Sequence, residues 1–92
     1  MNLQSAITLI NAATATGTSQ AITTDGAPLH VAVNGITSAT VNIEGSVDGS
    51  NWHLIGSALT ANGLVTIANP PKFVRANLTT YVSGTITVKA IY

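Results

Sequence analysis

The stretch that decides the fold runs from residue 39 to residue 67 and reads ATVNIEGSVDGSNWHLIGSALTANGLVTI. Apolar and polar residues alternate over 40–47, and the pairs Asp48-Gly49 and Asn62-Gly63 interrupt the apolar runs. Alternation with a period of two is typical of half-buried strands, and Asp-Gly or Asn-Gly between such runs indicates a tight turn. The stretch therefore predicts two consecutive β-hairpins.

The rest of the chain continues this pattern, and no window keeps the i, i+3, i+4, i+7 spacing of an amphipathic helix. Short strands separated by turn residues are typical of sandwiches. We therefore predict an all-β fold, a small antiparallel β-sandwich of the jelly-roll or immunoglobulin-like type. It has about eight short strands, expected at 6–10, 19–23, 29–34, 40–47, 52–57, 64–68, 73–79 and 85–91.

The same alternation predicts which side chains face inward, because a one-residue slip would turn every side chain of a strand to the other face. The side chains expected in the core are Leu29, Val31, Val33, Val41, Ile43, Val47, Trp52, Leu54, Val74, Ala76, Leu78, Ile86, Val88 and Ala90. The opposite faces are expected to present Thr40, Asn42, Ser46, Arg75, Asn77, Thr85, Thr87 and Lys89 to water or to a partner.

Charged residues are scarce and balanced in this chain. They make up 7% of the 92 residues, with three Lys or Arg against three Asp or Glu, whereas ordinary soluble domains contain roughly 25%. Such a chain has no electrostatic field that would attract nucleic acid or acidic lipid, so we expect neither as a partner. No linker divides the sequence, which predicts one domain over residues 1–92.

The scarcity of charge also leaves the strand edges unguarded. Open sheets usually protect their edges with Lys, Pro, bulges or a covering loop, and weakly charged surfaces favour association. We therefore predict a homo-oligomer, either a dimer or a trimer. In it, residues 1–18 would serve as an arm that contacts a neighbouring subunit.

The titratable residues form no pattern that indicates catalysis, metal binding or a cofactor. His30 and His53 are the only histidines, and their spacing matches no recognised interval of metal ligands. No His and carboxylate accompany a hydroxyl in a way that predicts a nucleophile. A domain of this size also offers little room for a cleft between two carboxylates. We predict that the protein is not an enzyme and has no catalytic, cofactor-binding or metal-binding residues.

The hairpin motif is predicted to be structural, because Asp can cap a turn, Gly can adopt a positive φ and Trp can close over the hairpin root. The residues assigned to turns and hairpins are Ser46, Asp48, Gly49, Trp52, Asn62 and Gly63.

Three polar residues near the C-terminal strands are predicted to lie at an interface. They are Lys72, Arg75 and Asn77. Arginine is enriched at interfaces, and its planar fork suits a carboxylate.

A binding module for a carbohydrate or a host receptor is the alternative function. It would use exposed aromatic rings that stack on a sugar, and the candidates are Trp52, His53, Tyr81 and Tyr92. This alternative requires those rings to gather on one face.

The motif SVDGSNW at 46–52, followed by FVR at 73–75, resembles a hairpin and a later strand of discoidin-like jelly rolls that bind carbohydrate or lipid. The resemblance covers residues 41–75. The ligand-binding spikes of that family lie outside the matched segment, so the resemblance implies a fold type and no binding residue.

A second resemblance extends from about residue 18 to the C-terminus. The motifs GSVDGSNW at 45–52, VRAN at 74–77 and SGTITV at 83–88 are similar to segments of small, cysteine-free β proteins of tailed-phage particles. This resemblance implies a virion component, made in the host cytoplasm, that decorates or cements the capsid exterior. It would bind the major capsid protein, and a position in the tail or neck is the alternative.

Overall fold

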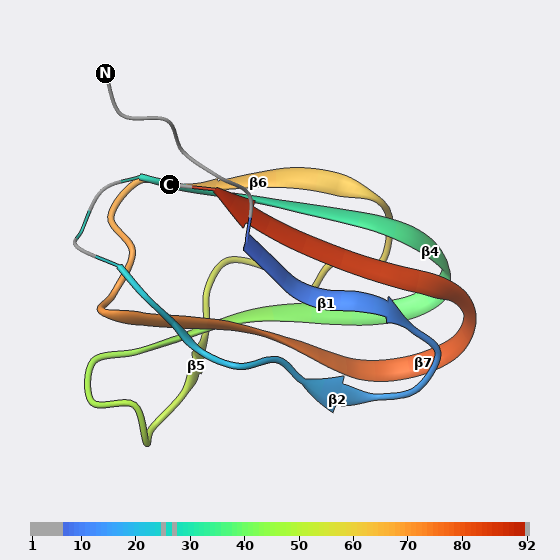
Figure 1. The fold of residues 1–92 in the computed structure, drawn as a ribbon, viewed down its shortest axis with the longest axis horizontal. Helices are drawn as coiled ribbons and strands as arrows, with labels where there is room; N and C mark the ends of the chain where they lie inside the picture. The colour runs from blue at the N-terminus through green and yellow to red at the C-terminus, as the bar shows by residue number, and fades with distance from the viewer. Residues whose placement is uncertain (1–6, 25, 27, 92) are drawn as a thin grey trace.

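Two long strands, β4 and β7, pair with each other along almost their whole length. In the computed structural model, which describes residues 7–24, 26 and 28–91, β4 spans Leu29–Ser46 and β7 spans Phe73–Ile91. Their antiparallel register runs from His30 opposite Ile91 to Ser46 opposite Phe73. The two strands form the central ribbon of the molecule (Figure 1).

The shorter strands extend this ribbon on both sides. The strands β1 (Ile7–Ala13), β2 (Gly17–Thr18) and β3 (Ile22–Thr23) pair in succession with β7. On the other side, β6 (Gly63–Ile67) pairs with the beginning of β4, and β5 (His53–Leu54) pairs with its end. All seven strands belong to one antiparallel sheet, and the all-β prediction is confirmed.

The ribbon bends back on itself at two glycines. Gly35 and Gly84 have φ angles of 85° and 120°, a region that glycine adopts without steric cost. A Cβ atom on Gly35 would overlap the carbonyl oxygen of Thr85, and one on Gly84 would overlap the carbonyl oxygen of Gly35. Asn62 supports the bend, because its Oδ1 accepts a hydrogen bond from the amide of Ile36 at 2.9 Å.

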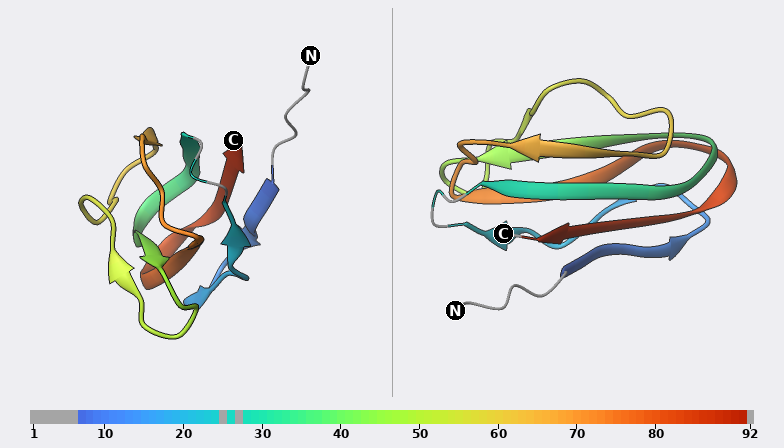
Figure 2. Two further views of the ribbon diagram at one scale, coloured as in Figure 1. Left: turned by 90° about the vertical axis from the view of Figure 1, so that its left-hand side faces the viewer. Right: turned by 90° about the horizontal axis from the view of Figure 1, so that it is seen from above.

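The bend divides the sheet into two layers that double back on each other (Figure 2). The first layer consists of β1, β6, residues 29–34 of β4 and residues 85–91 of β7. The second layer consists of β2, β3, β5, residues 39–46 of β4 and residues 73–80 of β7. Inward side chains of both layers form one hydrophobic core.

The sequence predicts β4 and β7 as two strands each, whereas both continue through the bend. Between Asn34 and Ala39, β4 stays paired with β7 while the register shifts at several steps. Such bulges let a strand bend without giving up its partner. The glycines that interrupt the apolar pattern therefore mark a fold within a strand and not the end of a strand.

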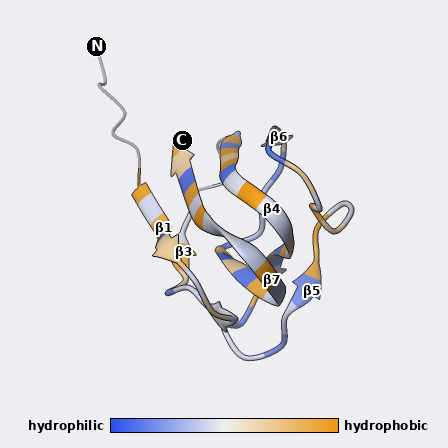
Figure 3. Ribbon diagram, turned by 90° about the vertical axis from the view of Figure 1, so that its right-hand side faces the viewer, coloured by the Kyte–Doolittle hydropathy of each residue, from blue (hydrophilic) through white to orange (hydrophobic). Residues whose placement is uncertain are grey.

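Hydrophobic and hydrophilic residues alternate along both long strands (Figure 3). Most of the predicted core is buried, and the structure adds Ile10, Ala39 and Ile67. Three predictions of core residues are wrong, because Val47 and Leu54 are exposed and Trp52 is only half-buried.

These errors lie just after β4 and on β5. Val47 follows the last paired residue, Ser46, so the alternation does not apply to it. On β5, Leu54 lies opposite Glu44 and therefore on the outer face. Ile55 packs against the core instead, a one-residue slip that exchanges the two faces. Ser46, which was expected on the outer face, is buried beneath the turn that follows it.

The second predicted hairpin is wrong. Strands β5 and β6 do not pair with each other, because each adds to a different layer along β4. Asn62 and Gly63 instead enter β6 after a loop that bridges back to Val41 through Leu59.

The predicted arm falls partly within the described residues. Residues 7–18 include β1 and β2, which pair with β7 of the same chain, and residues 1–6 lie outside the described part. No helix occurs in residues 7–24, 26 and 28–91, and so none there that is long and apolar enough to cross a membrane.

Candidate functional site

The turn after β4 is held by a closed set of short-range hydrogen bonds. The hydroxyl of Ser46 donates to Asp48 Oδ1 at 2.9 Å and accepts from the amide of Gly49 at 2.8 Å. Asp48 Oδ1 also accepts from the amides of Ser50 and Asn51, each at 2.9 Å. Gly49 supplies a φ of 80°, so the turn predicted at Asp48-Gly49 is present and its polar groups satisfy one another.

The carboxylate of Asp48 is stabilised in its charged form. The backbone amides of Asn51 and Ser50, and then the side chains of Asn51 and Ser46, hold the pKa of Asp48 below its ordinary value of 3.8. Hydrogen bonds to a carboxylate favour ionisation in this way. Because these bonds occupy both oxygens, Asp48 serves the turn and is not a free acid or base.

A polar cluster covers the outer face of the second layer. The register places Glu44 opposite Arg75 and Asn42 opposite Asn77. Arg75 Nε donates to Glu44 Oε1 at 2.8 Å, and Asn77 Nδ2 donates to Glu44 Oε2 at 3.2 Å. The neighbouring Asn42 keeps a buried Oδ1 without a hydrogen-bond partner among the described residues, which is unfavourable.

Trp52 belongs to this cluster. The guanidinium carbon of Arg75 lies 4.2 Å from the centre of the Trp52 ring, a cation–π contact. Arg75 therefore joins Trp52, just after the turn, to Glu44 on β4.

The charge of Arg75 is already paired within the chain, and a role for Lys72, Arg75 and Asn77 at an interface stays a prediction. Lys72 lies 5.4 Å from the ring centre of the adjacent Phe73.

The aromatic residues proposed as sugar platforms are dispersed. Trp52 lies under Arg75 on the outer face, whereas His53 borders a hollow at the inner side of the turn. Tyr81 packs against the core and donates a hydrogen bond to the carbonyl of Gly84 at 2.6 Å. Tyr92 lies outside the described residues. Since these three described rings do not gather on one face, the arrangement offers no stacking surface.

The histidines are likewise separated. His30 lies on β4 with its Nδ1 3.1 Å from the hydroxyl of Thr66, whereas His53 lies on β5 in the other layer. Within residues 7–24, 26 and 28–91, no group of three or more His, Asp or Glu side chains converges in a way that could hold a metal ion.

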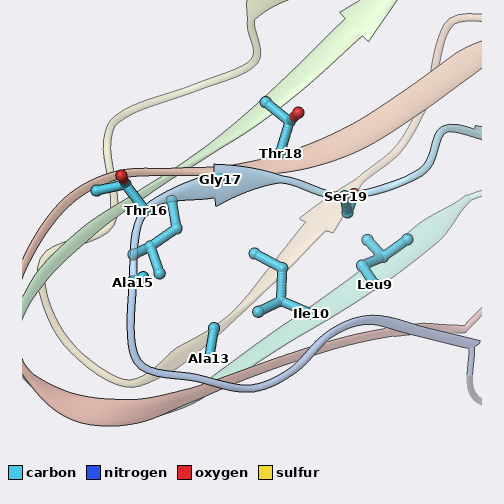
Figure 4. A pocket seen from close by; sticks show the side chains of 9 residues that line it. Leu9, Ile10, Ala13, Ala15, Thr16, Gly17, Thr18 and Ser19 are labelled. Atoms are coloured by element: carbon cyan, nitrogen blue, oxygen red, sulfur yellow. The ribbon is translucent and has the colours of Figure 1, made fainter.

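Small hollows open at the side of the sandwich and near the turn. The first, of about 250 Å³, lies between β1 and the segment that contains β2 (Figure 4), and is lined by Leu9, Ile10, Ala13, Ala15, Thr16, Gly17, Thr18, Ser19 and Leu78. Its lining carries no titratable side chain, so it can offer apolar contacts but no acid–base chemistry. The second, of about 230 Å³, is lined by Gly45, Ser46, Val47, Asn51, His53, Ile55 and Pro71.

Several polar residues that the sequence pattern did not single out tie the edges to the ribbon. Ser19 accepts a hydrogen bond from the amide of Ala76 at 2.9 Å, and Thr24 donates to the carbonyl of Pro71 at 2.7 Å. Asn62 was assigned to a turn, yet its side chain holds the bend at Ile36. Such long-range partners leave no local signal in the sequence.

No protein family, no curated protein and no solved structure matches this chain.

Proposed function

We propose that this chain is a structural protein of a tailed-phage virion, a decoration or cement protein that binds the capsid exterior as a homo-oligomer. The observation that carries the proposal is the pair of exposed valines at opposite ends of the molecule. A protein that spans the joints between capsid subunits needs contact surfaces at both of its ends.

The two valines lie where the chain reverses. Val47 follows β4 at the Asp48 turn and is 81% exposed, and Val82 lies in the bend of β7 and is 69% exposed. The turn and the bend are at opposite ends of the longest axis (Figure 1). In the free protein each valine exposes apolar surface to water. Burial of that surface against a neighbour would lower the free energy.

The surface around these valines carries little charge. The charged side chains in the described residues are Glu44, Asp48, Lys72, Arg75 and Lys89. Glu44 and Arg75 pair with each other, and the exposed carboxylate of Asp48 accepts hydrogen bonds from the amides of its own turn. Little long-range repulsion therefore opposes the close seating of many copies, and their contacts should depend only weakly on salt.

The mechanism is mechanical. Each seated copy buries apolar surface against two neighbouring capsid subunits and so adds association free energy across the joint. Contacts that are weak one by one give firm retention when an oligomer engages several sites at once.

Retention on particles from which the protein has been stripped tests the proposal. We expect wild-type protein to rebind the heads, in low and in high salt alike, and Val47→Glu and Val82→Glu each to rebind at least tenfold less. Ser57→Glu is the matched control, because it adds the same charge at an exposed position of the loop between β5 and β6. Equal rebinding of all four proteins, or binding to tails alone, would overturn the capsid assignment.

A further inference from the structure

The first layer ends in two strand edges of different quality. The β1 edge is irregular, because its ladder to β7 shifts register between Thr8 and Ile10 and again between Ile10 and Ala13. Ala12 on that edge has a φ of 50°. Bulges of this kind turn an edge away from the straight path that an added strand requires. The β1 edge is therefore protected.

The β6 edge has no such protection. Strand β6 pairs with β4 over five consecutive residue pairs, from Leu29 opposite Ile67 to Val33 opposite Gly63, without a register shift. It pairs with no other strand in the described part of the chain. Its sequence, GLVTI, contains no charge and no proline, and Leu64 is 69% exposed. Natural proteins rarely leave an edge of this type uncovered.

We propose that β6 pairs antiparallel with β6 of a second copy, which joins the first layers of two copies into one continuous sheet. This inference gives an interface to the homo-oligomer and rests on that part of the proposed function. The free backbone edge of an antiparallel strand is complementary to itself under a two-fold axis, as an isologous interface requires.

A second copy fits this edge better than a charged partner does. Neither β6 nor the segment of β4 that it pairs with, residues 29–33, contains Asp, Glu, Lys or Arg. Two copies can therefore approach without like-charge repulsion, whereas a charged partner strand would lose hydration and find no opposite charge. Full overlap of the two strands places the axis at Val65, with Leu64 of each copy opposite Thr66 of the other.

The interface is small, since only five residues of each copy pair. Stable interfaces bury roughly 1,200–2,000 Å² in total, more than a single strand edge supplies. We therefore expect a weak dimer with a dissociation constant of about 1 μM or higher. Seating on a particle would raise the local concentration and hold such dimers together.

Native mass, measured by light scattering from low micromolar to millimolar concentration, tests the inference. Wild-type protein should shift from monomer to dimer over this range. Leu64→Lys places an ammonium group at the edge and should stay monomeric throughout. Thr8→Lys adds the same group at an exposed position of the β1 edge and should dimerise like wild type. Circular dichroism shows whether each variant is folded.

Disulfide trapping tests the position of the axis, because the chain contains no cysteine. Val65→Cys should form a covalent dimer under mild oxidation, since residues facing each other across an antiparallel pair are close enough for a disulfide. Thr8→Cys should not. A wild type that is monomeric at every concentration, or a Leu64→Lys variant that still dimerises, would overturn the inference. The rebinding of Val47→Glu and Val82→Glu to particles judges the proposed function separately.

Discussion

The chain reverses direction at the bend in the middle of the β4–β7 ribbon and at the turn that follows Ser46 at one end of it. The two reversals depend on different interactions. At the bend, Gly35 and Gly84 pass so close to neighbouring backbone that a Cβ atom on either would overlap a carbonyl oxygen. At the turn, Asp48 and Ser46 hold the loop by side-chain hydrogen bonds, and a Cβ on Gly49 would meet the Phe73 ring only at 3.6 Å, an ordinary contact.

Because of this difference, the bend and the turn tolerate substitutions to different degrees. The bend is fixed by excluded volume between two segments that are far apart in sequence, so the loss of one glycine affects both strands and the packing of the two layers. The turn is fixed by polar groups within six residues, and it can lose one hydrogen bond while the ladder behind it stays intact. The fold therefore depends on the bend, whereas the turn adds only local stability.

The largest effect is expected at the bend. Gly35→Ala should lower the free energy of unfolding by more than about 3 kcal/mol, because the new methyl group overlaps the carbonyl oxygen of Thr85. Gly56→Ala is the matched control, since Gly56 has a similar φ of 73° with no atom within 4 Å of the added Cβ. It should cost only about 1–2 kcal/mol. Urea unfolding followed by Trp52 fluorescence measures both, and equal losses would remove steric overlap as the cause of the bend.

A smaller effect is expected beside the turn, where Arg75 links Trp52 to Glu44. Arg75→Met should cost about 1.5–3 kcal/mol, the value of a hydrogen bond to a charged group, and should make Trp52 easier to quench with acrylamide. Lys89→Met is the control, because Lys89 is exposed on the first layer and should change stability by less than about 0.5 kcal/mol. Unchanged quenching in Arg75→Met would contradict the stacking of these two side chains.

The smallest effect is expected within the turn and depends on pH. The pKa of Asp48 is lower in the folded protein than in the unfolded chain, so its carboxylate contributes stability above about pH 4 and loses it as the pH falls below that value. Asp48→Asn should have a lower urea midpoint than wild type at pH 7, and the difference should shrink by pH 3. A difference that is the same at both pH values would show that the charge of Asp48 does not stabilise the turn.

The turn, unlike the bend, could be predicted from the sequence. Its signal lies in nearly consecutive residues, because Ser46, Asp48 and Gly49 form hydrogen bonds with one another within the loop. Strand alternation likewise predicted the buried faces of β4 and β7. Both signals are local.

The bend and the polar cluster could not be predicted from the sequence, because they depend on contacts that exist only in the folded chain. Gly35 looks like any other turn residue until Thr85 is placed beside it. The partnership of Asn62 with Ile36 and the stacking of Arg75 on Trp52 also join distant segments. The face of β5 was predicted wrongly because a two-residue strand carries too little alternation to fix its own register.

The heat and osmotic resistance of particles made with and without this protein tests the central claim most directly. Heads that lack the protein should release their DNA at a lower temperature and after a milder osmotic shock, and adding purified wild-type protein should restore the original resistance. Heads that are equally resistant without the protein would contradict a role in stabilising the shell.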